Sequence, residues 1–431
     1  MYTIINIILF LILTVLGFRY LLENRYYAIK SPINKTEKFL VSNHQYLLLF
    51  ILGTAIIACG DMMASRLLIC ILICILALFV LKEPFSISIV FFTYLLFLLY
   101  LIYKWIYSPV PDYGFRQYVK YLYPFLLMIF ASRIPSSNVF YLKAIKIILM
   151  VAIVGSLALI CSHTPLRFIL GFFFQFLYWG PAIVDFLPVG VIICLSLFSY
   201  TKQRKYLLYV ILFILPSILW AWRTGILASA IAIVVFAVVR YKVKSIPYVI
   251  IGVFVLVGSV LYIPAVRNKM FIKQMSAEEV LERSGELSRD DINSSARFAM
   301  WEWYMDNFYV GNEVKGCGLG VISSTFKEGL TPFSGGAPHN EYLILLCDTG
   351  WIGIILYGLI FLSLIIHSFI VYFNPQYQML VRMSGLIAGG SLAGMMSTLY
   401  TDNVVTYSLL TLSYPFALYG MMLSLKRKYN N

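Results

Sequence analysis

Long apolar runs separated by short polar connections recur along the 431-residue chain. A helix that crosses the hydrocarbon core of a bilayer needs roughly 20 mostly apolar residues, and most of the runs come close to that length. The pattern predicts 12 or 13 transmembrane helices, and the count depends on the first five runs, whose boundaries are least distinct. The runs lie at 2–22, 39–60, 67–81, 85–103, 118–131, 147–162, 181–200, 206–222, 225–239, 249–266, 352–373, 383–399 and 404–425.

The composition excludes an ordinary soluble domain. The chain is 61% hydrophobic and 12% charged, whereas soluble domains carry about 25% charged residues. A water-soluble fold has too little polar surface to cover so much apolar side chain, but a bilayer accommodates it. We therefore predict an all-α polytopic membrane protein with one long polar loop. No small-residue cleavage site follows the first run, so we interpret that run as an uncleaved span rather than a signal peptide.

The net charge of +14 is concentrated in short loops at helix ends, not along a groove for a nucleic-acid backbone. Lys and Arg are enriched in the cytoplasmic loops of inner-membrane proteins. We therefore place the protein in the bacterial inner (cytoplasmic) membrane and expect no nucleic-acid partner. With 13 spans the N-terminus would be external, which is unusual and is one reason to prefer 12. Three dense basic groups mark the cytoplasmic face, at 202–205, 240–244 and 426–428.

The segment 266–341 is expected to form the polar loop on the outer face, and it holds more than half of the acidic residues. A capping-box pattern at Ser276–Glu279 predicts a short helix. Asn293 and the two serines after it predict the start of a second helix over 296–308.

Phe298, Trp301 and Met305 recur at helical spacing along the second loop helix. Such a stripe allows the helix to lie on the membrane surface or on the bundle. Glycines then punctuate a tail of turns, at positions 311, 316, 318, 320, 329, 335 and 336.

The seven cysteines give no sign of a metal centre. Five lie in or beside apolar runs, where a free Cys behaves as a small hydrophobic residue. Cys317 and Cys347 flank the later part of the outer loop, and a disulfide between them is an alternative to two free thiols. No Cys-x-x-Cys spacing occurs, and no phosphate-binding loop for ATP is present. We predict no metal and no cofactor.

Three side chains expected on the outer face are candidates for substrate binding or catalysis. Arg223 stands at the outer end of a span, Arg297 opens the loop helix, and His339 lies where the chain re-enters the membrane. Arg remains charged and can bind phosphate oxygens in bidentate fashion, and His can act as a general base near neutral pH. An enzyme on this face has no nucleotide supply, so a substrate that arrives activated, such as a lipid diphosphate, fits these residues.

Structural interpretations of the same three residues remain open. Arg223 can be a snorkelling anchor beside Trp220 and Trp222 in an aromatic belt. Arg297 can be a solvated charge on a helix surface, and His339 a hydrogen-bonded structural residue.

Other ionisable residues near the membrane have both a functional and a structural interpretation. Asp185, Asp348 and Asp402 can face the bundle interior or a cavity, or serve as the partner of an Arg or as a helix cap. Three further outward cations can meet an anionic lipid or be solvated loop charges: Arg116, Lys120 and Arg167.

The stretch from Pro338 to Tyr357 resembles the signature of the O-antigen ligase and O-antigen polymerase superfamily. That signature is a His followed by Asn or Ser, and then a helix with Gly-x-x-Gly before a long apolar span. In the right order, 222–228 resembles the Arg-containing span end of the family, and 295–301 with 316–320 resembles its loop helix and turn. The resemblance extends from residue 181 to the C-terminus.

The resemblance implies a GT-C-like helical bundle with a periplasmic loop. It also implies metal-independent, inverting glycosyl transfer from an undecaprenyl-diphosphate-linked glycan. Carried over to this chain, Arg223 and Arg297 would bind the diphosphate and His339 would assist the acceptor hydroxyl. We further assign substrate-binding roles to five residues: Arg167, Trp222, Asn340, Glu341 and Asp402.

On this hypothesis the chain divides into four regions. The N-terminal helices occupy 1–180, the central helices 181–265, the periplasmic catalytic loop 266–341 and the C-terminal helices 342–431.

Polymerase, ligase and transporter remain alternatives. A polymerase joins lipid-linked repeat units, and a ligase transfers the glycan to lipid A–core. We favour the polymerase, because the N-terminal third is not evidently ligase-like and the 32 Tyr and 32 Phe offer stacking surfaces for sugars. A flippase for the same lipid is less favoured, because no internal repeat is found. The expected partners are the lipid-linked oligosaccharide, the bilayer, and a chain-length regulator or a flippase.

Overall fold

The protein is represented by a computed structural model. It describes residues 2–23, 25–30, 38–57, 62–84, 88–162, 164–168, 181–220, 222–247, 249–250, 277–282, 297–333, 336–407 and 409–430, and isolated positions between 252 and 268. The predicted span 249–266 and the caps at Ser276 and Asn293 lie largely or wholly outside the described residues.

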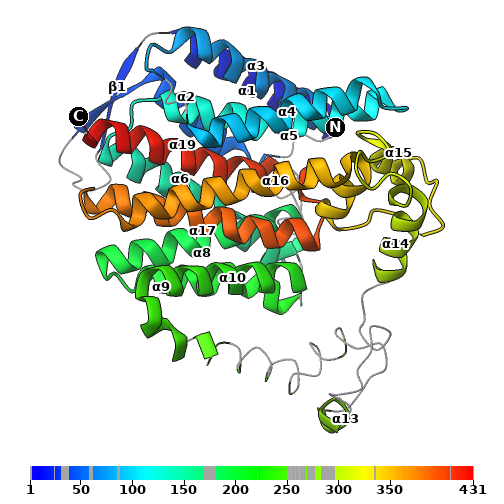
Figure 1. Cartoon of the computed structure of the whole chain (residues 1–431). Helices are drawn as coiled ribbons and strands as arrows, with labels where there is room; N and C mark the ends of the chain where they lie inside the picture. The colour runs from blue at the N-terminus through cyan, green and yellow to red at the C-terminus, as the bar shows by residue number, and fades with distance from the viewer. Residues whose placement is uncertain are drawn as a thin grey trace.

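Helices make up almost all of the described structure, in agreement with an all-α polytopic fold (Figure 1). The first half of the chain contains α1 (Tyr2–Leu22), β1 (Tyr26–Lys30), β2 (Lys38–Ser42), α2 (Asn43–Thr54), α3 (Met63–Val80), α4 (Ile89–Ile106), α5 (Pro111–Arg133), α6 (Asn138–Ser162) and α8 (Pro181–Thr201). The second half contains α9 (Lys205–Leu219), α10 (Arg223–Tyr241), η2 (Lys242–Ser245), α13 (Ala277–Glu282), α14 (Arg297–Tyr304), η4 (Met305–Tyr309), α15 (Val321–Lys327), α16 (Glu341–Phe373), α17 (Met379–Thr401), α18 (Val404–Tyr407) and α19 (Leu409–Asn430).

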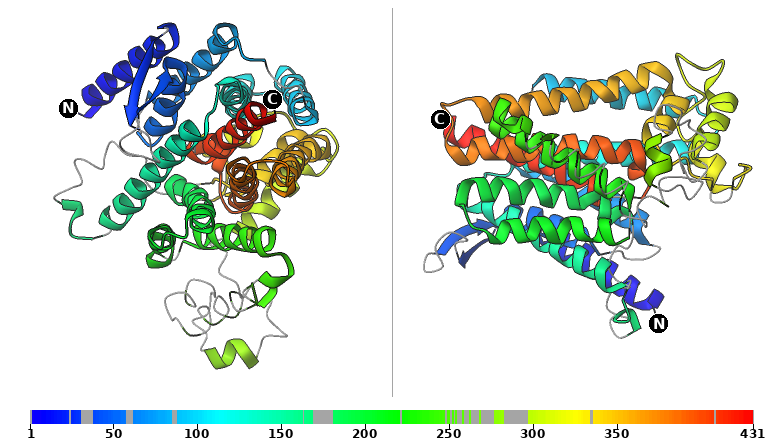
Figure 2. Two further views of the ribbon diagram at one scale, coloured as in Figure 1. Left: turned by 90° about the vertical axis from the view of Figure 1, so that its left-hand side faces the viewer. Right: turned by 90° about the horizontal axis from the view of Figure 1, so that it is seen from below.

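Eight of the described helices are long and apolar enough to cross a membrane: α1, α3, α4, α6, α8, α10, α16 and α17. The sequence pattern predicted 12 or 13. Part of the difference comes from α5 and α19, which are 23 and 22 residues long but outside that set. These two helices pack against each other and are covered by other helices (Figure 2). Helices that face protein on most sides can carry more polar residues than helices that face lipid.

The two termini lie at opposite ends of the bundle. Figures 1 and 2 show the N-terminus near the end that carries α14 and α15, and the C-terminus at the other end. The three basic groups gather at the C-terminal end, where Arg240 Nε donates to Ser199 Oγ at 2.9 Å and Lys426 lies 5.7 Å from the Tyr377 ring.

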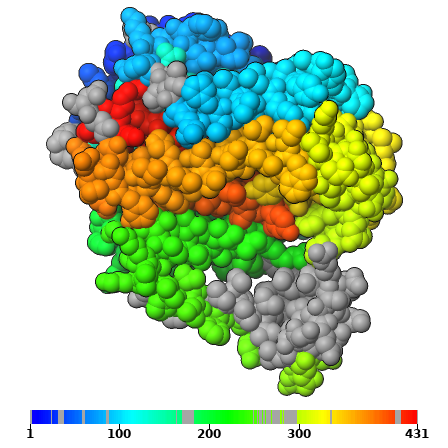
Figure 3. All heavy atoms as spheres, in the orientation of Figure 1, coloured from blue at the N-terminus to red at the C-terminus, as the bar shows by residue number. Residues whose placement is uncertain are grey.

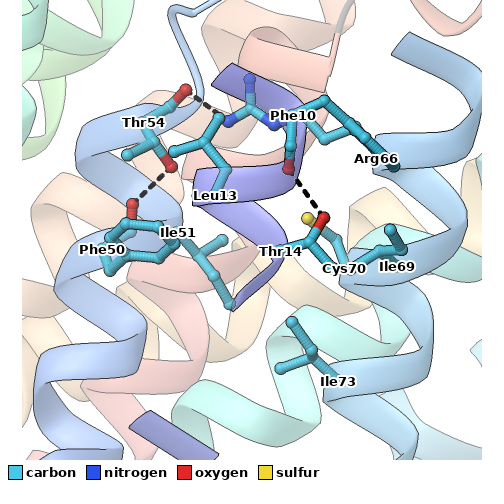
Figure 4. Close-up of a pocket in the computed structure, with 10 residues that line it drawn as sticks. All are labelled: Phe10, Leu13, Thr14, Phe50, Ile51, Thr54, Arg66, Ile69, Cys70 and Ile73. Carbon is cyan, nitrogen blue, oxygen red and sulfur yellow. Dashed lines mark hydrogen bonds between the residues drawn. The ribbon is translucent and has the colours of Figure 1, made fainter. Parts of the chain in front are cut away.

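The run 39–60 is not one span, contrary to the sequence pattern. Its first residues form β2, which pairs antiparallel with β1. Residues Asn43–Thr54 form the short helix α2, which begins with a capping box at Ser42. Arg66 of α3 donates to the carbonyls of Thr54 and Ile57. The Thr54 carbonyl is one of those that the end of α2 leaves without an intrahelical donor. Figure 4 shows Arg66 in the small, mostly apolar pocket between α1, α2 and α3.

Aromatic side chains fill the core between α4, α5 and α16. The ring of Phe97 lies 5.5 Å from Tyr121 and 5.3 Å from Tyr357, and Tyr94 lies 4.9 Å from Phe125. Offset and edge-to-face pairs at these distances stabilise beyond the area that they bury. The helices that begin or end near the outer loop are therefore held at fixed relative positions.

The helix predicted over 296–308 is present as α14, followed by the π-helical turn η4. It lies on the bundle, where Met300 and Tyr304 are its buried residues and Trp301 and Met305 of the expected stripe pack partly buried against them. The ring nitrogen of Trp301 donates to the Pro338 carbonyl at 2.6 Å. The segment from α14 to α15 forms a lobe over one end of the bundle (Figure 3).

The glycine-rich turns after η4 dock onto a kink in α16. Gly350 adopts φ +66° and ψ −166° inside that helix. A Cβ on Gly350 would lie 2.3 Å from the Val314 carbonyl oxygen, and one on Gly316 would lie 2.4 Å from the Thr349 nitrogen. Only glycine allows two backbones to approach this closely. The first glycine of the Gly-x-x-Gly pattern thus serves backbone contact between the loop and α16.

Candidate functional site

The ends of four helices meet under the outer lobe. Arg223 begins α10, Arg297 begins α14, His339 precedes α16 and Asp402 follows α17. Figure 1 shows these helix ends at the same end of the bundle. Residues that are up to 179 positions apart in sequence, counted from 223 to 402, therefore share one region of the molecule.

His339 and Asp402 form the closest polar contact of the site. The Nδ1 of His339 lies 2.9 Å from Asp402 Oδ1. The His339 side chain is 39% exposed and that of Asp402 is 8% exposed. A carboxylate at this distance orients the imidazole and favours the tautomer with the proton on Nδ1. The exposed ring then has Nε2 as the nitrogen that can take a proton.

The backbone of His339 has φ +49°, in the left-handed region that side chains with a Cβ adopt at a cost. The surrounding structure imposes this conformation. Asn340, the next residue, caps α16 by accepting from the Leu343 nitrogen at 3.1 Å. Its own backbone nitrogen donates to Asn403 Oδ1 at 3.2 Å. The hydrogen bonds of Asn340 therefore tie the backbone that follows His339 to the turn that carries Asp402.

Arg297 contacts the same turn. Its Nη1 donates to the Thr401 carbonyl at 2.8 Å. Burial lowers the pKa of Arg297 from its usual value, while the nearby charge of Asp402 acts in the opposite direction. An Arg side chain keeps its charge in such surroundings. The site thus contains a cation, a carboxylate and an imidazole around one turn.

Arg223 completes the cationic side of the site. Its guanidinium is half-buried, and it is close enough to Arg297 for the two positive charges to repel each other. Two arginines in this arrangement favour a shared anionic ligand, because the ligand relieves their repulsion. Trp222, the residue before Arg223, is partly buried against the hydrophobic core.

Glu341 faces the protein interior rather than the exposed face of His339. It is fully buried, and its Oε1 accepts from Gln117 Nε2 at 3.3 Å. Its Oε2 accepts from the Val405 nitrogen at 3.3 Å, and its charge interacts with Lys120. Both carboxylate oxygens are therefore used to join α5 and α16 to the turn after α17.

Arg167 lies apart from the other candidates. It is exposed, with its guanidinium 4.8 Å from the centre of the Phe168 ring. Figure 2 shows the end of α6 at the margin of the bundle. Among the described residues, no contact joins Arg167 to Arg223, Arg297 or His339.

The other two intramembrane aspartates differ in their surroundings. Asp348 is buried and accepts from the nitrogens of Gly320 at 2.8 Å and Ile322 at 3.0 Å, so it fixes the start of α15 to α16. Asp185 is 2% exposed, and neither carboxylate oxygen has a hydrogen-bond partner within the described part of the chain. The charge of Asp402 acts on Asp185, which places Asp185 beside the site.

The later cysteines are neighbours with free thiols. The Cys317 nitrogen donates to the Cys347 carbonyl at 2.9 Å, and burial raises the pKa of the Cys317 thiol. Within the described ranges, no group of three or more His, Cys, Asp or Glu side chains is placed to hold a metal ion.

Sequence reasoning missed Asn403 and Gln117. Asn403 follows Asp402 directly, and its side chain receives the Asn340 nitrogen. Gln117 lies 224 residues before Glu341. Both side chains position a site residue through a hydrogen bond and are not themselves candidates for catalysis. No short-range pattern marks such a role, because the contact exists only after folding.

Comparison with known proteins gives one finding on the family. Residues 208–358 match the family model described as O-antigen ligase. The match includes α9, α10, α14, α15 and the first half of α16, and it therefore contains Arg223, Arg297 and His339. It ends before Asp402. No curated protein matches the chain.

The positive φ of His339 leads to a stability prediction that is independent of chemistry. His339→Gly and His339→Ala both lose the contact with Asp402, but only glycine adopts φ +49° without strain. We expect the Gly variant to be more stable than the Ala variant by about 1 kcal/mol. Thermal unfolding of the two purified variants in detergent measures the order. A more stable Ala variant would contradict the strained conformation.

Proposed function

We propose that this chain is a glycosyltransferase of the bacterial inner membrane that belongs to the O-antigen ligase and polymerase superfamily, and the match of residues 208–358 to the family model described as O-antigen ligase supports the proposal. Its donor is a glycan linked to undecaprenyl diphosphate. The reaction joins repeat units of a surface polysaccharide on the periplasmic side. The observation that carries this proposal is the His339–Asp402 contact beside Arg297 and Arg223.

The donor diphosphate lies against the two arginines. Arg223 and Arg297 repel each other, and a diphosphate with several negative charges offsets that repulsion. As the sugar leaves, negative charge grows on the diphosphate oxygen that loses the bond. Fixed cations at this position stabilise the transition state more than the ground state, and this difference accelerates the reaction.

The acceptor hydroxyl lies on the other side of the reacting carbon. Its oxygen attacks the anomeric carbon on the face opposite the diphosphate, which inverts the configuration. The bond between that carbon and the diphosphate oxygen breaks, and its electron pair leaves with the diphosphate. His339 Nε2 takes the hydroxyl proton, and Asp402 on Nδ1 stabilises the imidazolium that forms.

The polymerase is the proposed form of this activity. The first half of the structure presents many aromatic side chains near the outer end, such as Trp105, Phe115 and Tyr118, and aromatic faces can contact sugar rings. A ligase would use the same donor and the same three residues, but would deliver the glycan to lipid A–core. The ligase is the second candidate, because the matched family model is described as O-antigen ligase.

A cell that lacks this protein separates the two activities. If it is the polymerase, the lipopolysaccharide should carry a single repeat unit on the core. If it is the ligase, the core should carry no O-antigen at all, because transfer to the core is lost. Gel electrophoresis of the lipopolysaccharide distinguishes these outcomes. Polysaccharide of normal length on the core would contradict both.

Arg297→Ala tests the cationic half of the site. Removing one charge that stabilises a transition state costs about 2.7–4 kcal/mol of barrier, so the transfer rate should fall by two to three orders of magnitude. Long-chain product should be almost absent while the protein remains in the membrane. Lys315→Ala is the matched control, because Lys315 is an exposed cation in the same outer lobe. Normal chain length in Arg297→Ala would rule out the assigned role.

Asp402→Asn tests the orientation of His339. The amide can still occupy the position near Nδ1, but it cannot stabilise an imidazolium by charge. We expect the transfer rate to fall by about 10²–10⁴-fold, with little change in thermal stability. Asp306→Asn, at an exposed acid of η4, should keep the wild-type rate. A wild-type rate in Asp402→Asn would remove Asp402 from the mechanism.

A further inference from the structure

A second group of cations lies at the outer end, on elements that the proposed mechanism does not use. Arg116 and Lys120 are one helical turn apart on α5, and Lys327 ends α15. Arg116 and Lys327 are exposed, whereas Lys120 is only partly so. We call these three residues the α5–α15 cation cluster.

The cluster is assembled by a close contact between two glycines. A Cβ on Gly320 would lie 2.4 Å from the Gly114 nitrogen, and one on Gly114 would lie 2.8 Å from the Leu319 carbonyl oxygen. This contact places the start of α15 directly on the first turn of α5. α15 packs against α5 (Figure 1), and Lys327 at the other end of that short helix reaches the same Tyr113 ring as Arg116.

The ring of Tyr113 contacts both exposed cations. The Arg116 guanidinium carbon is 5.3 Å from the ring centre, and the Lys327 ammonium nitrogen is 6.0 Å from it. Cation–π contacts of this kind hold both charges over one surface. The positive charges are thus gathered rather than dispersed, although like charges repel.

Protein carboxylates do not neutralise the exposed part of the cluster. Asp112 and Glu328 are exposed acids next to it in sequence, but in the described structure no ion pair within 4 Å involves Arg116 or Lys327. Two buried acids lie nearby: Glu341 interacts with Lys120, and Asp348 accepts from the nitrogens of Gly320 and Ile322 at the start of α15. Burial and the charge of Arg116 both lower the pKa of Lys327, as expected for a cation held beside another.

The cluster lies near the start of α16, where Gln117 of α5 donates to Glu341 at 3.3 Å. Lys120 interacts with Glu341, which is two residues after His339. Arg223 and Arg297 instead approach from α10 and α14. Two cationic regions, which come from different helices, are therefore found near the end of the bundle that carries His339.

We propose that the α5–α15 cation cluster binds the phosphate of the second substrate, the acceptor lipid. This inference rests on the proposed function, in which Arg223 and Arg297 hold the donor diphosphate. A second lipid-linked saccharide brings its own diphosphate, which cannot share the donor's position. A second cationic region at the end of the bundle that carries His339 holds that group and directs the acceptor sugar toward Nε2.

The test compares two acceptors. The purified full-length protein receives the same donor with a lipid-diphosphate-linked repeat unit, or with the same saccharide that lacks its lipid diphosphate. In Lys327→Gln and Arg116→Gln, the KM for the lipid-linked acceptor should rise about three- to tenfold. The KM for the free saccharide and for the donor should stay unchanged. Lys315→Gln, at an exposed lysine of the same lobe, should change none of the three.

A third acceptor, a phosphorylated lipid A–core, shows whether the cluster binds a core phosphate or a lipid diphosphate. If only that acceptor shows the rise in KM, the cluster binds a core phosphate and not a lipid diphosphate. An unchanged KM for every phosphorylated acceptor in both variants would overturn the proposal. So would an equal rise for the free saccharide, because contacts to the sugar would then explain the effect.

A binding measurement distinguishes failure of this inference from failure of the proposed function. Binding of the lipid-linked acceptor is measured without donor in an Arg297→Ala background, where the donor position is weakened. Weaker binding when Lys327→Gln is added supports the acceptor site even if no glycosyl transfer is detected. Unchanged binding when either Lys327→Gln or Arg116→Gln is added contradicts it, whatever the enzyme activity.

Discussion

The turn between α17 and α18 is the point on which the site depends. Asp402 contacts His339, the Thr401 carbonyl binds Arg297, Asn403 receives the Asn340 nitrogen, and the Val405 nitrogen binds Glu341. Polar groups at this depth are costly unless they are paired. The turn pairs groups from α14, α16 and α17 at once, so moving any one of these helices would leave buried polar atoms without partners.

This constraint links the fold to the proposed chemistry. The bonds around Asn340 and Asn403 hold His339 at a positive φ, and such strained positions occur at functional sites when the surrounding structure over-determines them. The glycine contacts between the loop and α16 fix the lobe that carries Arg297. A preorganised cation needs no rearrangement when charge develops, which is the main advantage of a rigid site over water.

Two cationic regions beside one imidazole suit a reaction between two anionic lipids. Arg223 and Arg297 begin α10 and α14, and the α5–α15 cation cluster gathers around Tyr113 on α5. Both regions are held together against their own repulsion by burial, aromatic faces and backbone contacts. The electrostatic repulsion between the like charges costs free energy, and binding of an anionic substrate offsets that cost. The arrangement therefore favours substrates that carry phosphate.

The sequence by itself determined the membrane class, and it singled out Arg223, Arg297 and His339 as candidate site residues, because hydropathy and short motifs are local properties. It did not determine that 39–60 forms a strand and a short helix, that α5 and α19 are polar yet central, or that α14 buries Met300 and Tyr304. Tertiary structure alone decided that Asp402 contacts His339, that Glu341 points inward and that Lys327 lies close to Arg116. Those contacts connect residues up to 224 positions apart, and only the packing of the helices brings them within hydrogen-bonding or electrostatic range.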